Sequence, residues 1–392
     1  MSRFMQRSPH LQRLTPNYIF AEIKIRVDAY LKKHPDGRKL ISLALGDTTH
    51  PLPEVISNEL SDAALKLATD AGYRGYNPLH GLDALKASIS ENIYNNTLAA
   101  DEITISDGIK PDLARFALLS GGKQKVAIQD PSYPVYLETS QLVGDEVILL
   151  PATKENGFFP DWCSLKGPHL LFLCSPNNPT GVAATKQQLQ KIVDHARKEG
   201  MLILFDAAYQ AFVTDPSIPR SIFEIEGAKS CAIEWGSFSK SAGFSGLRLG
   251  WCAMSKELRY LTGESILDDW KRILHSSLNG VSYLSQMGGI KALSKEGQKD
   301  LQPIVQGYLE NTRLLKKALT KKGIQSYGGL HTPFLWADFA PKTSWEAFDE
   351  LLTKYQIVTT PGVGFGSAGE GFIRFSALGK PHDLLDALHR LA

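Results

Sequence analysis

The chain has few of the residues that build metal sites, disulfide frameworks or membrane spans. Only four of its 392 residues are cysteine, and none of them has the spacing of a zinc or redox motif. We therefore expect no metal ion and no disulfide, and we interpret the cysteines as buried free thiols. No segment approaches the roughly 18 consecutive apolar residues of a membrane helix, which argues against insertion into a membrane.

An excess of charge of one sign is also missing. The 43 Lys and Arg residues balance 41 Asp and Glu residues, so no strong field draws the protein to nucleic acid or to an anionic membrane surface. An anionic ligand must then be held by a local site. The first 21 residues contain three arginines and no acid, but they lack the apolar core of a secretory signal. We interpret them as an ordered N-terminal arm and expect a cytoplasmic protein.

The middle of the chain has the pattern of a parallel β-sheet. Short apolar runs alternate there with polar helical stretches, as in strands that are buried on both faces. These runs are residues 125–129, 170–174, 201–205 and 231–235. A capping-box spacing that begins at Thr185 and a terminal glycine at Gly200 complete one β-α-β unit between the second and third runs.

The length of the chain is too great for one ordinary core and predicts about two domains. Helical periodicity is plain at 20–33, 82–95 and 301–322. We expect an α/β fold: a large domain with a mainly parallel central sheet flanked by helices, and a smaller α+β domain built from both chain ends. The predicted boundaries are 1–46 for the N-terminal arm and part of the small domain, 47–280 for the large domain and 281–392 for the small C-terminal domain.

Residues 237–251 place one lysine between hydroxyls and glycines, with an arginine eight residues later. The amine of Lys240 can form a Schiff base with an aldehyde, and glycines let the backbone come close to a ligand. Ser237, Ser239 and Arg248 can donate hydrogen bonds to a phosphate dianion. Together these groups predict a site for pyridoxal 5′-phosphate (PLP), carried by the large domain. The alternative is a glycine-rich surface loop with a solvated lysine.

Polar residues follow the other apolar runs, at the edge of a parallel sheet where ligands bind. Asp206 directly ends one run, and its carboxylate can keep the pyridine nitrogen of PLP protonated, so that the ring accepts electrons. Asn178 and Tyr209 offer an amide and a phenol for the cofactor's phenolic oxygen. The alternatives are a helix cap for Asp206 and a simple turn residue for Asn178.

A second phosphate-binding segment begins at Gly108, which precedes a helix predicted to start near Pro111 and to end at 121–122. Free N–H groups at a helix start bind anions. Tyr133 follows another strand and can stack on a flat ring, or belong to the core. Arg374 lies in an apolar strand, so it either pairs with an unseen acid or receives a substrate carboxylate.

The chain resembles the class I and II aminotransferases of PLP fold type I, and within them the chlamydial-type branch that acts on LL-2,6-diaminopimelate. The similar segments are 17–20, 45–49, 73–76, 106–110, 128–134, 174–181, 204–209 and 372–376. The resemblance covers nearly the whole chain. It implies transfer of an amino group between glutamate or 2-oxoglutarate and tetrahydrodipicolinate or LL-2,6-diaminopimelate, for the synthesis of lysine and peptidoglycan.

The resemblance also implies a homodimer with shared active sites, in which the neighbouring subunit contributes Tyr76 and Asn279. The residues implied to contact the cofactor are Gly108, Ile109, Lys110, Tyr133, Asn178, Asp206, Tyr209, Ser237, Ser239, Lys240, Arg248, Tyr76 and Asn279. Those implied to contact the amino acid or 2-oxo acid substrate are Tyr18, Gly46, Lys110, Tyr133, Asn178 and Arg374. Lys240, Asp206 and Tyr209 are the implied catalytic residues.

Two positions depart from the family pattern. Leu79 stands where the family has a carboxylate that meets the distal ammonium of diaminopimelate, three residues after the interface tyrosine. An alkyl group leaves that ammonium unpaired, unless nearby Asp83 or His80 compensates. Ile109 replaces the usual alanine beside the phosphate. A related aminotransferase with another amino acid substrate is therefore an alternative.

The predicted reaction is a ping-pong transamination in which Lys240 first anchors the cofactor and then acts as the base at the substrate Cα. For that role the pKa of its amine must lie below the ordinary value. One alternative is β-elimination on the same cofactor. A PLP-responsive regulator would carry a DNA-binding domain, and the balanced charge argues against it. A purely structural protein would have no use for a lysine between two phosphate-binding segments.

Overall fold

The computed structural model describes residues 6–14, 18–35, 37, 39–167 and 169–391. Its helices are α1 (Ile19–Lys33), α2 (Glu54–Lys66), α3 (Asp83–Asn92), α4 (Ile109–Ser120), α5 (Pro134–Val143), α6 (Lys186–Glu199), α7 (Phe238–Ser241), α8 (Ile266–Ser277), α9 (Tyr283–Leu293), α10 (Lys295–Lys321), α11 (Ser344–Tyr355) and α12 (Pro381–Leu391). Its strands are β1 (Ile41–Ser42), β2 (Ile103–Ser106), β3 (Lys125–Asp130), β4 (Glu146–Pro151), β5 (Leu170–Cys174), β6 (Leu202–Asp206), β7 (Ala232–Ser237), β8 (Gly250–Met254), β9 (Ser326–Gly328), β10 (Phe334–Asp338), β11 (Ile357–Val358), β12 (Thr360–Pro361) and β13 (Phe372–Ser376).

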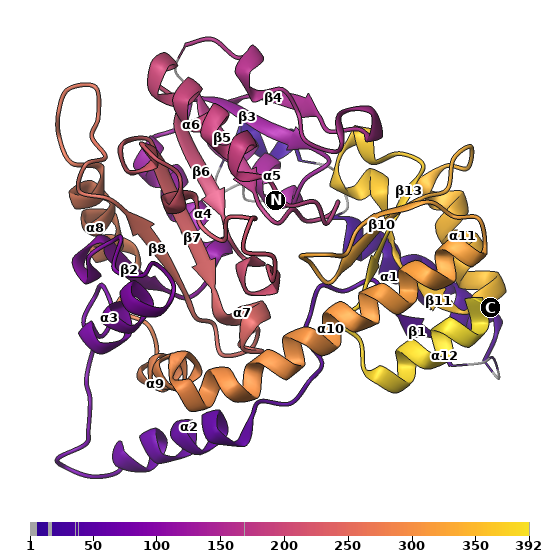
Figure 1. The fold of residues 1–392 in the computed structure, drawn as a ribbon, viewed down its shortest axis with the longest axis horizontal. Helices are drawn as coiled ribbons and strands as arrows, with labels where there is room; N and C mark the ends of the chain where they lie inside the picture. Colours follow the sequence, from indigo (N-terminus) through magenta and orange to yellow (C-terminus); the bar gives the residue numbers. More distant parts are fainter. Residues whose placement is uncertain (1–5, 15–17, 36, 38, 168, 392) are drawn as a thin grey trace.

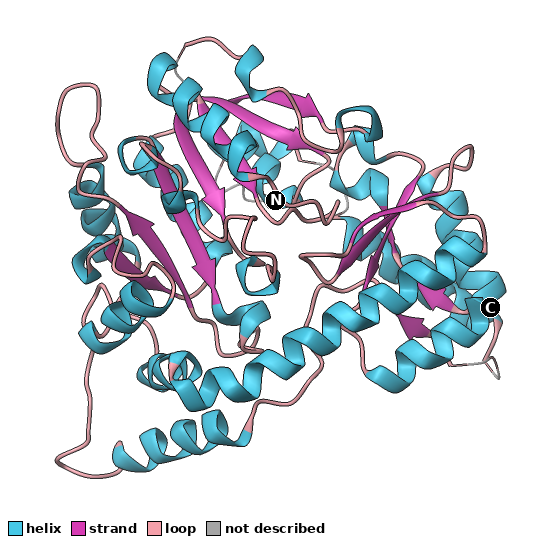
Figure 2. Cartoon of the chain, viewed as in Figure 1, coloured by secondary structure: helices cyan, strands magenta, loops and turns pink. Residues whose placement is uncertain are grey.

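Seven strands form the larger sheet in the order β2-β8-β7-β6-β5-β3-β4. β8 is antiparallel to both of its neighbours, and the other pairs are parallel. Each central strand is apolar on both faces: Leu171 and Ile203 pack on the side of α6, whereas Phe172 and Leu204 pack on the side of α4, α5 and α8. Helices thus cover both faces (Figures 1 and 2). The predicted fold class is confirmed.

The predicted β-α-β unit is present between β5 and β6. The Thr185 side chain accepts a hydrogen bond from the Gln188 N–H, and Gly200 ends α6 with the left-handed backbone that glycine adopts readily. The two strands then pair in parallel with Cys174 opposite Asp206. β6 begins one residue later than predicted and includes Asp206, so this carboxylate is the last residue of a buried strand.

A second, four-stranded antiparallel sheet has the order β12-β13-β10-β9 and lies beside the larger one (Figure 1). Near it, β1 from the N-terminal part pairs in parallel with β11. A separate buried core joins these elements to α1, α11 and α12. The small unit therefore draws on both chain ends. The exact boundaries at 46 and 280 stay a prediction.

The long helix α10 runs along both units (Figure 1). It begins six residues before the predicted start at 301, because the Ser294 side chain caps it and because Pro303 is accommodated inside the helix. α3 ends earlier than predicted, at Asn92, since Asn95 and Asn96 adopt positive φ values of 48° and 59°. A side-chain cap explains the first difference and local backbone geometry explains the second, and the periodicity of side chains reports neither.

The four thiols are free, and three of them are buried. Cys163 is only partly buried, so the expectation of buried thiols was wrong at this position: it lies in a short 3-10 turn over α6 rather than in a strand. In the part of the chain that the structure describes, no helix has both the length and the apolar character to cross a bilayer.

Candidate active site

The predicted site residues Asn178, Asp206 and Lys240 follow or end three neighbouring strands of the larger sheet. Asn178 lies in the loop after β5, Asp206 ends β6, and Lys240 lies in α7 directly after β7. Because β5, β6 and β7 are parallel and adjacent, the three residues come to the same sheet edge. Tyr209, three residues after Asp206, is buried at this edge too.

Asp206 is a buried carboxylate with no cationic partner among the described residues. Its Oδ2 accepts a hydrogen bond from the Tyr136 hydroxyl at 2.6 Å, and its Oδ1 accepts one from the Ala208 N–H at 2.9 Å. Burial raises the pKa of Asp206, and these two bonds oppose that rise. A cation placed against this carboxylate would therefore be stabilised, as the protonated pyridine nitrogen of PLP requires.

Tyr136 was not predicted from the sequence. It lies in α5, which begins at Pro134 directly after Tyr133. Its ring stacks on Phe172 of β5 with 5.0 Å between centroids, and Tyr133 meets it edge to face at 5.6 Å. The helical spacing of Tyr133 and Tyr136 is the signal that could have indicated a shared role.

Lys240 has the character that a nucleophilic amine requires. Burial lowers its pKa; the nearby guanidinium groups of Arg374 and Arg248 lower it further, and Asp47 partly opposes the shift. Its Nζ lies 3.4 Å from the Ser245 hydroxyl oxygen. A larger fraction of unprotonated amine is thus available near neutral pH for attack on an aldehyde.

The two predicted phosphate-binding segments meet at the antiparallel strand β8. Ser106, at the end of β2, and Ser237, at the end of β7, both pair with Gly250. Gly108 has φ +122°, and a Cβ added to it would lie 2.4 Å from Nη2 of Arg248. Only glycine therefore fits between this helix start and the guanidinium. The Arg248 guanidinium is positioned by a hydrogen bond that it donates to the Ser245 carbonyl at 2.8 Å.

Hydrogen-bond donors surround this point. α4 begins at Ile109, two residues before the predicted start, so the N–H groups of Ile109 and Lys110 lie in the first helical turn, where they lack helical acceptors. The Ser237 hydroxyl caps α7 through the Ser239 N–H at 3.0 Å. Two helix starts and one guanidinium therefore face one position, which fits a phosphate dianion. The residues present fit PLP.

Arg374, in the centre of β13, is 2% exposed and has no carboxylate partner among the described residues. Its Nη1 donates to the Asn178 side-chain oxygen at 2.7 Å, and its Nη2 donates to the Ala44 carbonyl at 2.6 Å. Its Nε is buried without a partner. The first predicted alternative for Arg374, an ion pair with an acid, is therefore not found among the described residues.

Two phenylalanines hold the guanidinium of Arg374 in place. Its central carbon lies 4.5 Å from the ring centroid of Phe334 and 4.7 Å from that of Phe365. Burial lowers the pKa of Arg374 to about 10, which still leaves it charged at neutral pH. A desolvated, flat and oriented cation is suited to bidentate binding of a carboxylate. No pattern in the sequence predicts this role for Phe334 or Phe365, which are 31 residues apart.

The remaining predicted substrate residues lie around Arg374. Tyr18 occupies the N-cap position of α1 without a side-chain capping bond, and the Lys110 Nζ lies 5.6 Å from the centroid of its ring. A Cβ on Gly46 would lie 3.3 Å from the Phe334 ring and 4.0 Å from the hydroxyl of Tyr209. Asn17, which begins one of the similar segments, lies outside the described residues.

Tyr76 and Asn279 face away from the chain that carries them. Tyr76 is 87% exposed, and Asn279 is exposed as well. Their loops touch, because the Asn77 side chain donates to the Val281 carbonyl at 2.8 Å. Leu79, in the same loop, is partly buried. Within one chain these residues form a joint exposed surface.

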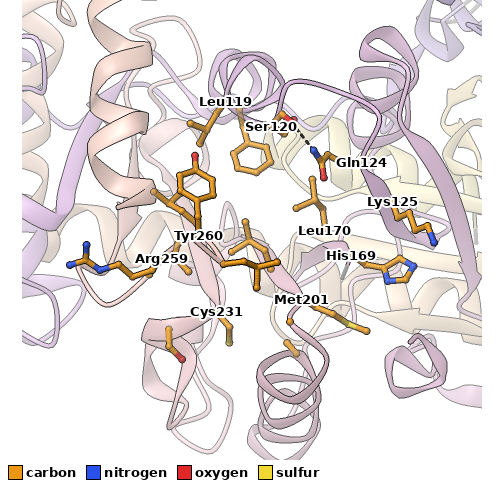
Figure 3. A pocket seen from close by; sticks show the side chains of 18 of the residues that line it. Leu119, Ser120, Gln124, Lys125, His169, Leu170, Met201, Cys231, Arg259 and Tyr260 are labelled. Carbon is orange, nitrogen blue, oxygen red and sulfur yellow. Dashed lines mark hydrogen bonds between the residues drawn. The ribbon is translucent and has the colours of Figure 1, made fainter. Parts of the chain in front are cut away.

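A different cavity, of about 660 Å³, lies at the opposite edge of the sheet, where β3, β5 and β6 begin (Figure 3). Leu170 and Met201 line it, and none of the predicted site residues does. The side chains of Lys125 and Arg259 point away from its centre (Figure 3). Its polar groups do not converge, unlike those at the carboxyl edge.

The family model for "Aminotransferase class I and II" matches residues 38–391. The chain is 45% identical to an LL-diaminopimelate aminotransferase of Protochlamydia amoebophila, with 99% of this chain and 97% of the relative covered. It is 40% identical to the chloroplastic LL-diaminopimelate aminotransferase of Arabidopsis thaliana, with 98% and 86% covered. The solved structure of the L,L-diaminopimelate aminotransferase from Chlamydomonas reinhardtii matches with a TM-score of 0.94 at 43% identity, and 100% of this chain and 98% of that one are covered.

Proposed function

The chain belongs to the class I and II aminotransferases, and we propose that it transfers an amino group between LL-2,6-diaminopimelate and 2-oxoglutarate. In the biosynthetic direction glutamate donates the amino group to tetrahydrodipicolinate. The observation that carries the proposal is the pairing of the Lys240 site with a desolvated Arg374 that no acid of the described chain neutralises. The substrate is proposed from the named relatives, which are 40% to 45% identical to this chain.

The cofactor of this family is PLP. When bound, PLP supplies the aldehyde for covalent capture of an amine and a ring that accepts electrons from the substrate Cα. Lys240 would hold its aldehyde carbon, Asp206 its ring nitrogen, and the helix starts with Arg248 its phosphate. Asn178 and Tyr209 would lie beside its phenolic oxygen.

The remaining steps depend on Arg374, Lys240 and Asp206. Arg374 binds the α-carboxylate of the substrate and thereby fixes which bonds of Cα face Lys240. The freed Lys240 amine removes the proton from Cα, and its lowered pKa increases the fraction of unprotonated amine available for that step. The Tyr136 hydroxyl opposes the effect of burial on the pKa of Asp206 and so favours the ionised carboxylate, which would support positive charge on the cofactor's ring nitrogen.

We further propose that two copies of the chain complete each site, with the partner supplying Tyr76 and Asn279. The exposed position of both side chains on touching loops supports this assembly, since a tyrosine that is 87% exposed has no packing role within one chain. Light scattering should give the mass of a dimer. A cytoplasmic location stays a prediction.

The test is a steady-state assay with purified, PLP-loaded protein. LL-diaminopimelate with 2-oxoglutarate should yield glutamate, and no ammonia or pyruvate should appear when serine or cystathionine is offered. Release of ammonia and pyruvate would favour β-elimination instead. If glutamate forms from other amino acids but not from LL-diaminopimelate, the protein is an aminotransferase with a different substrate.

A further inference from the structure

Leu79 leaves the distal ammonium of diaminopimelate without the acid that the family pattern provides. A replacement must line a space that the distal end of the substrate can enter from the carboxylate site at Arg374. A cavity of about 530 Å³ opens there, lined by Tyr18, Glu138 and Phe365 among others. Phe365 is one of the two rings that hold the Arg374 guanidinium, so this cavity adjoins the carboxylate site.

Three acidic side chains line this cavity, and two of them are engaged. Glu22 forms an ion pair with Arg26 at 3.2 Å. Asp130 accepts a hydrogen bond from the Ser367 hydroxyl at 2.8 Å and further bonds from the following backbone N–H. Glu138 makes no hydrogen bond or ion pair with any described residue. It is half-buried, so of the three carboxylates it is the one that is available to bind a ligand.

Glu138 also lies within electrostatic reach of the predicted substrate residues. Burial raises the pKa of Tyr18, Glu138 raises it further, and Arg374 lowers it. Burial also raises the pKa of Glu138, which nearby Lys110 lowers. The Tyr18 phenol is therefore near both the negative charge of Glu138 and the positive charge of Arg374. The Lys110 Nζ lies over the Tyr18 ring, and Glu138 lines the same cavity as Tyr18. No ion pair joins Glu138 to Lys110 among the described residues.

We propose that Glu138 binds the distal ammonium of the substrate, with Lys110 at the distal carboxylate and Arg374 at the α-carboxylate. This assignment rests on the proposed function. Helix α5 then supplies the negative charge that the loop containing Leu79 lacks. The ligand class is an amino dicarboxylate that carries a second ammonium group at its far end.

The test compares wild type with Glu138→Gln on substrates that differ in their distal groups. LL-Diaminopimelate carries both distal groups, lysine carries only the ammonium, and 2-aminopimelate carries only the carboxylate. We expect E138Q to lower kcat/KM for LL-diaminopimelate and lysine by about tenfold, because a half-buried charge pair is lost. The value for 2-aminopimelate should stay within about twofold, since it never engages the ammonium site.

Glu22→Gln is the matched control, because Glu22 lines the same cavity but is paired with Arg26. It should leave the preference among the three substrates unchanged. Glutamate-dependent conversion of bound cofactor to its amine form reports that each variant is folded and loaded. Equal losses of E138Q on LL-diaminopimelate and 2-aminopimelate, or no loss on either, would overturn the assignment to Glu138. If wild type itself does not use LL-diaminopimelate, the proposed function fails instead.

Discussion

The site has two sides that are built in different ways. The cofactor side comprises Lys240, Asp206 and the two phosphate-binding segments, which all adjoin ends of strands in one sheet. The carboxylate side comprises Arg374 and the groups that hold it. Those groups come from residue 44, from the loop after β5 and from the segments around 334 and 365.

The difference lies in how each side fixes its charges. On the cofactor side, the carboxylate and the amine are placed by regular strands, and their pKa shifts arise from burial within one domain core. On the carboxylate side, a single cation is held by neutral groups that are distant in sequence. Every amino acid substrate presents an α-carboxylate, so both sides serve the common chemistry, and the choice among substrates depends on groups that meet the distal end of the substrate.

The largest effect should come from the cofactor side. Lys240→Ala removes both the anchor of the cofactor and the base, so kcat should fall by at least about 10⁴-fold. The measurement is single-turnover conversion of bound cofactor by glutamate. Lys299→Ala, on the exposed face of α10, is the control and should convert normally. A normal rate in K240A would remove this lysine from the mechanism.

Arg374→Lys tests the carboxylate side. Lysine cannot form two parallel hydrogen bonds or stack between Phe334 and Phe365, so KM for amino acids should rise about 100-fold. PLP affinity, measured by titration of the cofactor-free protein, should change little. A comparable loss of PLP binding would mean that the two sides are not separate.

Tyr136→Phe weakens the cofactor side without removing a charge. The hydroxyl stabilises ionised Asp206, so its loss raises the pKa of that carboxyl further. Asp206 then becomes protonated at higher pH, and the acid limb of kcat/KM should move upward by about one pH unit. The pH–rate profile measures this. An unmoved acid limb would show that Tyr136 serves packing alone.

Glu234→Gln has the smallest expected effect and concerns stability. Glu234 is fully buried in β7 and accepts hydrogen bonds from Tyr94 and Ser221. Burial raises its pKa from 4.5 to about 7. Between these values the folded state keeps a proton that the unfolded state releases, so stability is fully present below pH 4.5 and declines as pH rises toward 7.

Over this pH range the free energy of unfolding of the wild type should fall by on the order of 1 to 3 kcal/mol, and that of E234Q should fall by less. Urea unfolding of the cofactor-free protein at pH 5, 6 and 7.5 measures it. Glu91→Gln, exposed on α3, is the control and should keep the slope of the wild type. An identical slope in E234Q would assign the pH dependence to other groups.

The two sides also differ in how far the sequence could predict them. Asp206 was found because an apolar run predicts a strand, and the residue that follows a strand is placed by the sheet itself. Lys240 was found from the hydroxyls and glycines around it, and Gly108 from the helix start predicted after it. Phe334, Phe365 and the Ala44 carbonyl could not be found, because the contacts with Arg374 join segments up to 330 residues apart. Glu138 was missed because an acid on an amphipathic helix gives no signal until its neighbours are known.

Removal of the amino group of LL-diaminopimelate at this site can be followed in a single-turnover reaction. PLP-loaded wild type is mixed with LL-diaminopimelate in the absence of any 2-oxo acid, and the absorbance of the bound cofactor is followed. We predict complete conversion to the amine form, faster than with the meso isomer or with lysine. Conversion by glutamate but not by LL-diaminopimelate would contradict the proposed function.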